Sequence, residues 1–178
     1  LGLRDWQVHA APGHDPHSVV LFEPQRRLLI SADALWERGF GVVFPGLEGE
    51  QAFAEVEATL DVIEQLQPEW VLPGHGGMFS DVAGALTVAR KRLADFQADP
   101  QRHAQYADKV LLKYKLLEWQ QASCQQVQDW CASTPLMQQM RQRYFADQDP
   151  VAWVLALLQA LAAARAVVWE GDQVRNVD

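Results

Sequence analysis

The sequence predicts an α/β domain followed by a mainly helical domain, and two patterns lead to this prediction. In the first part of the chain, short apolar runs of strand length alternate with amphipathic helical patterns, an order typical of α/β layers. After Asp99-Pro100 the helical period dominates, and the chain closes with two short alternating runs around Gly171-Asp172. We therefore predict two domains, 1–98 and 99–178.

The first domain opens with three strand candidates. Residues 6–10 alternate apolar and polar side chains, 18–22 form an apolar run, and 28–32 return after a polar turn. The glycine-rich region 36–49 has no period, so we predict a loop, one that could line a cleft.

Two helices and a fourth strand complete this domain. Apolar residues recur at helical spacing over 50–66, and Pro68 ends that helix. Residues 70–72 are predicted as a short buried strand. Ser80 or Asp81 then caps a second helix.

The second domain contains several short helices. Helical patterns cover 101–120, 123–132, 135–145 and 150–165, and the closing hairpin follows them. Short helices followed by a hairpin are typical of a winged helix. His103 lies on a polar helix start and is predicted to be solvated.

Composition argues against several classes of partner. The net charge is −8, so we expect no strong nucleic-acid binding and no attraction to an anionic membrane surface. The longest apolar run, 151–168, is interrupted by Gln159 and Arg165 and is predicted as a buried helix. Cys124 and Cys131 make no disulfide framework, which favours a reducing, cytoplasmic location.

Three residues of the kinds that bind metals follow strand candidates. His14 comes after a Pro-Gly turn, Asp33 after the third strand, and His75 inside a Pro-Gly-His-Gly-Gly loop. A carboxylate at the end of a buried strand costs free energy unless it is paired or bound to a cation. Imidazole and carboxylate together suit zinc, and also manganese or iron.

The ordered set is more specific than its members. The order of the motifs is Gly-His, a hairpin, Asp at a strand end, a helix and then Pro-Gly-His-Gly. This order resembles the C-terminal half of the metallo-β-lactamase fold, an αββα sandwich, over residues 5–97. More narrowly, it resembles the glyoxalase II-like and hydrolase branch. The tail is similar to the winged-helix-like extension of some members, including the human lactamase-like RNA-processing type.

The resemblance assigns roles to the three residues. It implies that His14 completes one metal site, that Asp33 bridges two metals, and that His75 completes the second site. It also implies a zinc-dependent hydrolase, in which a metal-bound hydroxide attacks an ester, a thioester or a related bond of a small-molecule substrate. His17, beside the first of these residues, is a candidate for substrate contact.

The family's His-x-His-x-Asp-His cluster does not occur in this sequence. We therefore expect the chain to be a fragment of a longer enzyme, inactive alone and binding metal weakly or not at all, because a zinc site normally needs three or four protein ligands. Half of a sandwich leaves one sheet face exposed, and a second copy would cover it, so a homodimer is an open alternative.

Two other functions remain open at this point. Lys109, Lys113 and Lys115 give the tail a modest basic edge, which leaves a nucleic-acid-processing member of the same superfamily as an alternative. The other alternative is a non-enzymatic winged-helix interaction module.

Overall fold

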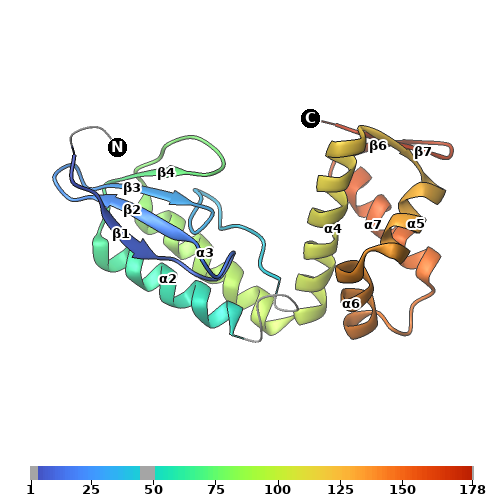
Figure 1. Ribbon diagram of the computed structural model, residues 1–178, viewed down its shortest axis with the longest axis horizontal. Helices are drawn as coiled ribbons and strands as arrows, with labels where there is room; N and C mark the ends of the chain where they lie inside the picture. The colour runs from blue at the N-terminus through green and yellow to red at the C-terminus, as the bar shows by residue number, and fades with distance from the viewer. Residues whose placement is uncertain (1–3, 45–50, 178) are drawn as a thin grey trace. The chain divides into compact units, whose positions relative to one another are not determined.

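The structure is a computed structural model that describes residues 4–44 and 51–177 (Figure 1). The predicted helix start at Glu50 and the last part of the predicted loop 36–49 lie outside the described residues. The chain divides into two compact units, Leu1–Ala98 and Asp99–Asp178, and each unit has its own core.

The first unit contains a four-stranded sheet, and its strands lie in sequence order. They are β1 (Gln7–Ala10), β2 (Val19–Glu23), β3 (Leu28–Ala32) and β4 (Trp70–Pro73). The β1–β2 and β2–β3 pairs are antiparallel, whereas β3 and β4 are parallel. Strands β1, β3 and β4 therefore run in the same direction, and their carboxyl ends lie at one edge of the sheet.

Two helices cover one face of this sheet: α2 (Ala52–Leu66) and α3 (Val82–Ala98) (Figure 1). Each helix turns a stripe of apolar side chains toward the alternate, buried positions of the strands. The fully buried side chains of this core include Val20, Leu29 and Val71 from the sheet and Leu60, Ile63 and Ala89 from the helices.

The opposite face of the sheet, which we call the open face, is apolar. Pairing places Val8, Leu21, Ile30 and Leu72 in one row across the four strands. Val8 and Leu72 are 65% and 44% exposed. The prediction of a buried strand at 70–72 was therefore wrong, because its central residue faces the helices whereas its two flanking residues face outward.

The second unit combines four helices with a small sheet. The helices are α4 (Pro100–Trp119), α5 (Cys124–Ser133), α6 (Pro135–Tyr144) and α7 (Pro150–Ala163). Their ends follow local signals: Asp99, Ser123 and Asp149 cap three helices through side-chain oxygens, and proline occupies the first turn of three. Within residues 4–44 and 51–177, no helix has the length and apolar content needed to cross a membrane.

The small sheet contains one strand that was not predicted. The expected hairpin forms β6 (Val167–Glu170) and β7 (Gln173–Asn176), and β5 (Gln121–Ser123) pairs with β7 on its other side. The three residues of β5 are too short a run to show a strand period in the sequence.

The prediction that His103 is solvated was wrong, since this residue is only 3% exposed. The buried stripe of α4 includes His103, Ala104, Ala107 and Asp108 before its leucines begin. Two polar residues therefore occupy core positions. A prediction from the hydrophobic pattern would place such residues on the solvent-exposed side of the helix.

Candidate functional site

The three candidate ligands follow the three strands that run in the same direction. His14 follows β1, Asp33 follows β3 directly, and His75 follows β4. Gly13 makes the turn before His14 with φ +129°, a conformation that side chains rarely adopt, and a Cβ there would lie 2.5 Å from a methyl group of Val56. The fold therefore brings the three residues to one edge of the sheet.

Their side chains meet at the carboxylate of Asp33. Oδ2 of Asp33 lies 3.5 Å from Nε2 of His14, and Oδ1 lies 3.7 Å from Nε2 of His75. One carboxylate oxygen thus faces each imidazole. The side chains of His14 and Asp33 are each 31% exposed, and that of His75 is 60% exposed, so the site is open to solvent.

A backbone carbonyl fixes the orientation of the His14 ring. Nδ1 of His14 donates a hydrogen bond of 2.6 Å to the carbonyl oxygen of Val42. Because a carbonyl only accepts, the proton of this bond is on Nδ1, and in the neutral imidazole this selects the tautomer with a lone pair on Nε2. Asp15, the next residue in the chain, accepts from the backbone N–H of His17 at 2.8 Å.

In the neutral imidazole, this tautomer directs the Nε2 lone pair at the side of the site where Oδ2 of Asp33 lies. A metal ion placed between these two atoms would take both as ligands. The donor set is also that of a metal site, in which a histidine uses one nitrogen for the metal and its other N–H for a backbone carbonyl.

Two glycines allow the ligands to approach the backbone closely. A Cβ on Gly41 would lie 2.9 Å from Cβ of Asp33 and 2.9 Å from Cγ of His14. A Cβ on Gly74 would lie 2.8 Å from Oδ1 of Asp33. We call Gly41 and Gly74 the glycine cradle. They leave room for the Asp33 carboxylate and the His14 imidazole, which larger residues at these positions would displace.

The backbone around Asp33 leaves the regular strand geometry. The pairing of β3 with β4 shifts register between Ile30 and Ala32, and Ala32 adopts φ +46°. Hydrogen bonds hold this irregular segment: Gly41 N–H donates to the Asp33 carbonyl, and Gly74 N–H donates to the Ala32 carbonyl, both at 2.7 Å. Strained backbone of this kind persists where the surrounding structure fixes it.

Trp36 is a residue of the site that the sequence did not single out as a contact of Asp33. Its indole Nε1–H donates to Oδ1 of Asp33 at 3.0 Å. Its ring packs edge-on against the His75 ring, with the centroids 5.0 Å apart and the planes at 76°. From the sequence it was only one of several aromatic residues in a glycine-rich loop, and Phe40 of the same loop is a buried core residue.

His17, the candidate for substrate contact, lies in the exposed turn after His14. Its backbone is held by Asp15, while its side chain is open to solvent. His17 is thus close to His14 in the sequence, but its ring is not among the side chains that meet at Asp33.

The number of ligands per cation is low. Across the described ranges 4–44 and 51–177, no group of three or more His, Cys, Asp or Glu side chains is arranged around one metal position. Each half of the Asp33 carboxylate instead faces one imidazole. The separations of 3.5 and 3.7 Å are close to the ~3.3 Å expected between two ligand atoms on one tetrahedral zinc ion with bonds of about 2.0–2.1 Å. The pairs therefore fit a metal in geometry and chemistry but supply two ligands per position.

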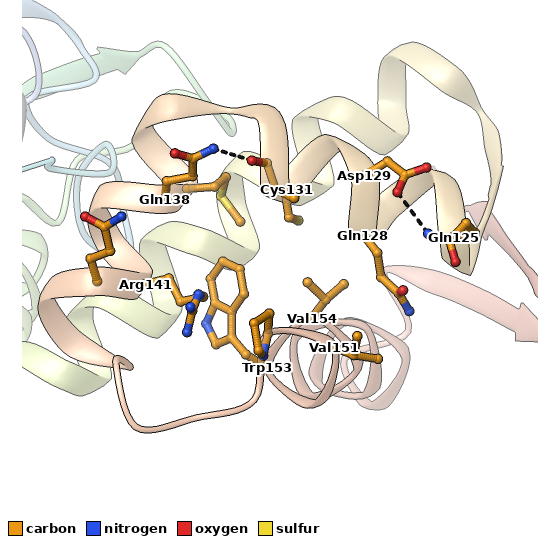
Figure 2. Close-up of a pocket in the computed structure, with 13 residues that line it drawn as sticks. Gln125, Gln128, Asp129, Cys131, Gln138, Arg141, Val151, Trp153 and Val154 are labelled. Carbon is orange, nitrogen blue, oxygen red and sulfur yellow. Dashed lines mark hydrogen bonds between the residues drawn. The ribbon is translucent and has the colours of Figure 1, made fainter.

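A hollow lies in the second unit, between α5, α6 and the first turn of α7 (Figure 2). Its volume is about 410 Å³. Some of the polar groups that line it bond to the protein itself: Gln125 donates to Asp129, and Arg141 donates to the carbonyl of Gln148.

Residues 1–75 match the model of the metallo-beta-lactamase superfamily. The match confirms the resemblance to this superfamily for the part of the chain that contains His14, Asp33 and His75. Curated protein sequences gave no match.

Several solved structures are similar to the chain. A metallo-beta-lactamase family protein from Thermus thermophilus is 20% identical, with a TM-score of 0.46 over 97% of this chain and 49% of its own. A beta-lactamase domain protein from Burkholderia ambifaria is 24% identical, with a TM-score of 0.47 over 99% of this chain and 48% of its own. A protein solved in a di-iron-bound form is 27% identical, with a TM-score of 0.37 over 49% of this chain and 44% of its own. The chain thus spans about half the length of the first two.

Proposed function

We propose that this chain is part of a metal-dependent hydrolase and that His14, Asp33 and His75 are metal ligands. The observation that carries the proposal is the Asp33 carboxylate between two imidazole nitrogens, at 3.5 and 3.7 Å. The tautomer of His14 and the glycine cradle support it, because both prepare the site for a cation. The superfamily match of residues 1–75 supports the same reaction class.

The residues have separate roles in this proposal. Asp33 would hold both metals through its carboxylate, His14 would be the nitrogen ligand of the first, and His75 would be that of the second. Zinc is the metal we propose, with manganese or iron as alternatives, because imidazole and carboxylate ligands suit all three. Such metals supply an activated water and a Lewis acid for cleavage of an ester, a thioester or a related bond in a small-molecule substrate. His17 is proposed to contact that substrate from its exposed turn.

We propose that the remaining ligands come from a His-x-His-x-Asp-His cluster in a polypeptide segment other than these 178 residues. Two ligands per position are fewer than the three or four that hold zinc tightly. The chain alone is therefore proposed to bind metal weakly and to be inactive. The proposed setting is the cytoplasm, where Cys124 and Cys131 stay reduced.

The nucleic-acid alternative is disfavoured by the contacts of Lys113 and Lys115, two of the three lysines of α4. Nζ of Lys113 donates to the carbonyls of Ala166 and Val177, at 3.0 and 2.7 Å, and also to the side chain of Asn176. Lys115 pairs with Glu118 at 2.8 Å. Cations used inside the unit are less available for phosphates. We propose that the winged-helix-like tail packs against a protein surface instead.

Two measurements test the proposal. In a zinc titration followed by imidazole NMR, we expect weak binding that shifts the resonances of His14 and His75, and no shift of His103, which lies in the core of the other unit. Asp33→Ala should abolish these shifts. If neither resonance moves in the unaltered chain, the proposed metal role is refuted. Two tightly held zinc ions per chain would instead refute the proposal that this chain lacks part of the ligand set.

The second measurement is the gene sequence upstream of the Leu1 codon. We expect it to encode a His-x-His-x-Asp-His cluster within one half-domain. A reading frame without this cluster contradicts the proposed hydrolase, since no source for the remaining ligands would be left in the same polypeptide.

A further inference from the structure

We infer that Trp36 is a positioning residue that holds the Asp33 carboxylate in the orientation needed to face both imidazoles. This inference rests on the proposed metal role of Asp33. The indole N–H donates to Oδ1 at 3.0 Å, and the other oxygen, Oδ2, is left to face His14. Rotation about the Cβ–Cγ bond of Asp33 would move its two oxygens away from the two imidazoles. The hydrogen bond from the indole N–H opposes this rotation.

The backbone of Trp36 is itself fixed. Its N–H donates to the carbonyl of Gly39 at 2.7 Å, which closes a short turn directly after Asp33. Next to it in the chain, Leu35 is fully buried, and the carbonyl of Leu35 accepts from the hydroxyl of Ser31 at 2.6 Å. The indole therefore has a rigid base, which a group that positions another side chain requires.

Trp36 also links the carboxylate to the more exposed imidazole. No hydrogen bond to a backbone carbonyl fixes the His75 ring within the described residues, in contrast to the ring of His14. Edge-on packing against the indole is the contact that orients it. One side chain thus sets two of the three candidate ligands: Asp33 by hydrogen bonding and His75 by packing.

The two functions of the indole can be separated by substitution. Trp36→Phe removes the N–H donor and keeps an aromatic ring near His75, whereas Trp36→Ala removes both. Trp169 provides a matched control in the other unit, because its Nε1–H also makes a hydrogen bond of 3.0 Å, to the carbonyl of Gly171. Trp169→Phe therefore removes the same kind of bond away from the site.

The first experiment needs no metal. In the ¹H–¹⁵N spectrum of the chain, Trp36→Phe identifies the Trp36 indole resonance. We expect Asp33→Ala to move that resonance upfield and to speed its exchange with solvent, while the Trp169 resonance stays in place. An indole resonance that ignores Asp33→Ala would overturn the inference.

The second experiment measures zinc affinity by the shift of the His14 imidazole resonance. We expect Trp36→Phe to weaken binding about tenfold, the lower end of the loss seen when a group that orients a metal ligand is removed. Trp36→Ala should weaken it further and broaden the His75 resonance, and Trp169→Phe should leave it unchanged. Equal affinities for Trp36→Phe and Trp169→Phe would contradict the inference.

The two proposals fail in different ways. If zinc moves neither imidazole in the unaltered chain, the proposed metal role is wrong, and the metal-free spectrum still decides whether Trp36 orients Asp33. If zinc binds, but the Trp36 indole resonance ignores Asp33→Ala and Trp36→Phe leaves the zinc affinity unchanged, the metal role stands and the positioning role is wrong.

Discussion

At the scale of single residues, the glycine cradle offers a direct test of how tightly the site is built. Gly74→Ala would place a Cβ 2.8 Å from Oδ1 of Asp33 and 3.1 Å from the Ala32 carbonyl group, distances that real Cβ atoms rarely show. Since the carboxylate must move away, we expect zinc affinity to fall at least about tenfold, as for other losses of ligand orientation. Calorimetric or NMR titration measures the change.

Gly77 is the matched control in the same loop. A Cβ on Gly77 would meet no atom within 4 Å, so Gly77→Ala should leave zinc binding as it is. Equal effects of the two substitutions would show that the loop responds to any added methyl group and that Gly74 has no special place beside Asp33.

The sequence allowed the meeting of His14, Asp33 and His75 to be predicted, because the ends of strands that run in the same direction lie at one edge of a sheet. The supporting contacts could not be predicted in the same way. The partner of the His14 ring is the backbone carbonyl of Val42, and a carbonyl is present at every position of the chain. The bond from Trp36 depends on the path of an irregular loop, which has no sequence period.

At the scale of elements, the packing of α4 against its neighbours includes a buried carboxyl group. Asp108 is fully buried, and neither of its carboxylate oxygens has a hydrogen-bond partner within the described residues. Burial raises the pKa of Asp108 from 3.8 to about 7. Burial, with the nearby charge of Asp108 as a second cause, raises the pKa of the Cys131 thiol in α5 to about 12.

The raised pKa of Asp108 predicts that the second unit loses stability as pH rises. The unfolded chain releases this proton near pH 4 and the folded chain near pH 7, so between these values the folded state binds more protons. The free energy of unfolding should therefore fall across that window, by up to about 4 kcal/mol in total.

Two variants of Asp108 separate charge from packing. Asp108→Asn keeps the shape without the titrating proton, and Asp108→Leu fills the site with an apolar group. Both should remove the fall in stability between pH 4 and 7, measured by urea denaturation at several pH values. A fall of the same size in Asp108→Asn as in the unaltered chain would show that another group is responsible.

The helices of both units were predictable because each carries several turns of apolar period, and α4 and α7 also begin at a capping aspartate followed by a proline. Helix α2 has no capping side chain, so its apolar period alone predicted it. Strand β5 was not, since a three-residue strand is defined by its partner β7, some fifty positions away, rather than by its own pattern. The exposure of β4 was also missed. A run of three apolar residues does not reveal that only one face of its sheet is covered.

At the scale of the whole molecule, the open face predicts that the 178-residue chain associates with a second copy of itself. Val8, Leu21, Ile30 and Leu72 form a continuous apolar row, and such surfaces commonly mark an interface. We expect the chain to form a dimer with a second copy through this face. Sedimentation equilibrium over a range of concentrations measures the association.

Leu72→Lys should shift this equilibrium toward the monomer, because a charge in the row would be buried on association. Val88→Lys is the control, since Val88 lies on α3 and is 45% exposed, close to the 44% of Leu72. A monomer at all concentrations, or equal effects of the two lysines, would rule out the open face as the contact.

The register shift between Ile30 and Ala32 has a consequence for how this region tolerates change in length. Because side chains alternate between the faces of a strand, one residue more or fewer before Asp33 would exchange inward and outward positions at the strand end. The carboxylate would then turn away from both imidazoles, although every ligand would still be present. We therefore expect a single insertion or deletion in β3 to disrupt the site more than a substitution at the same position.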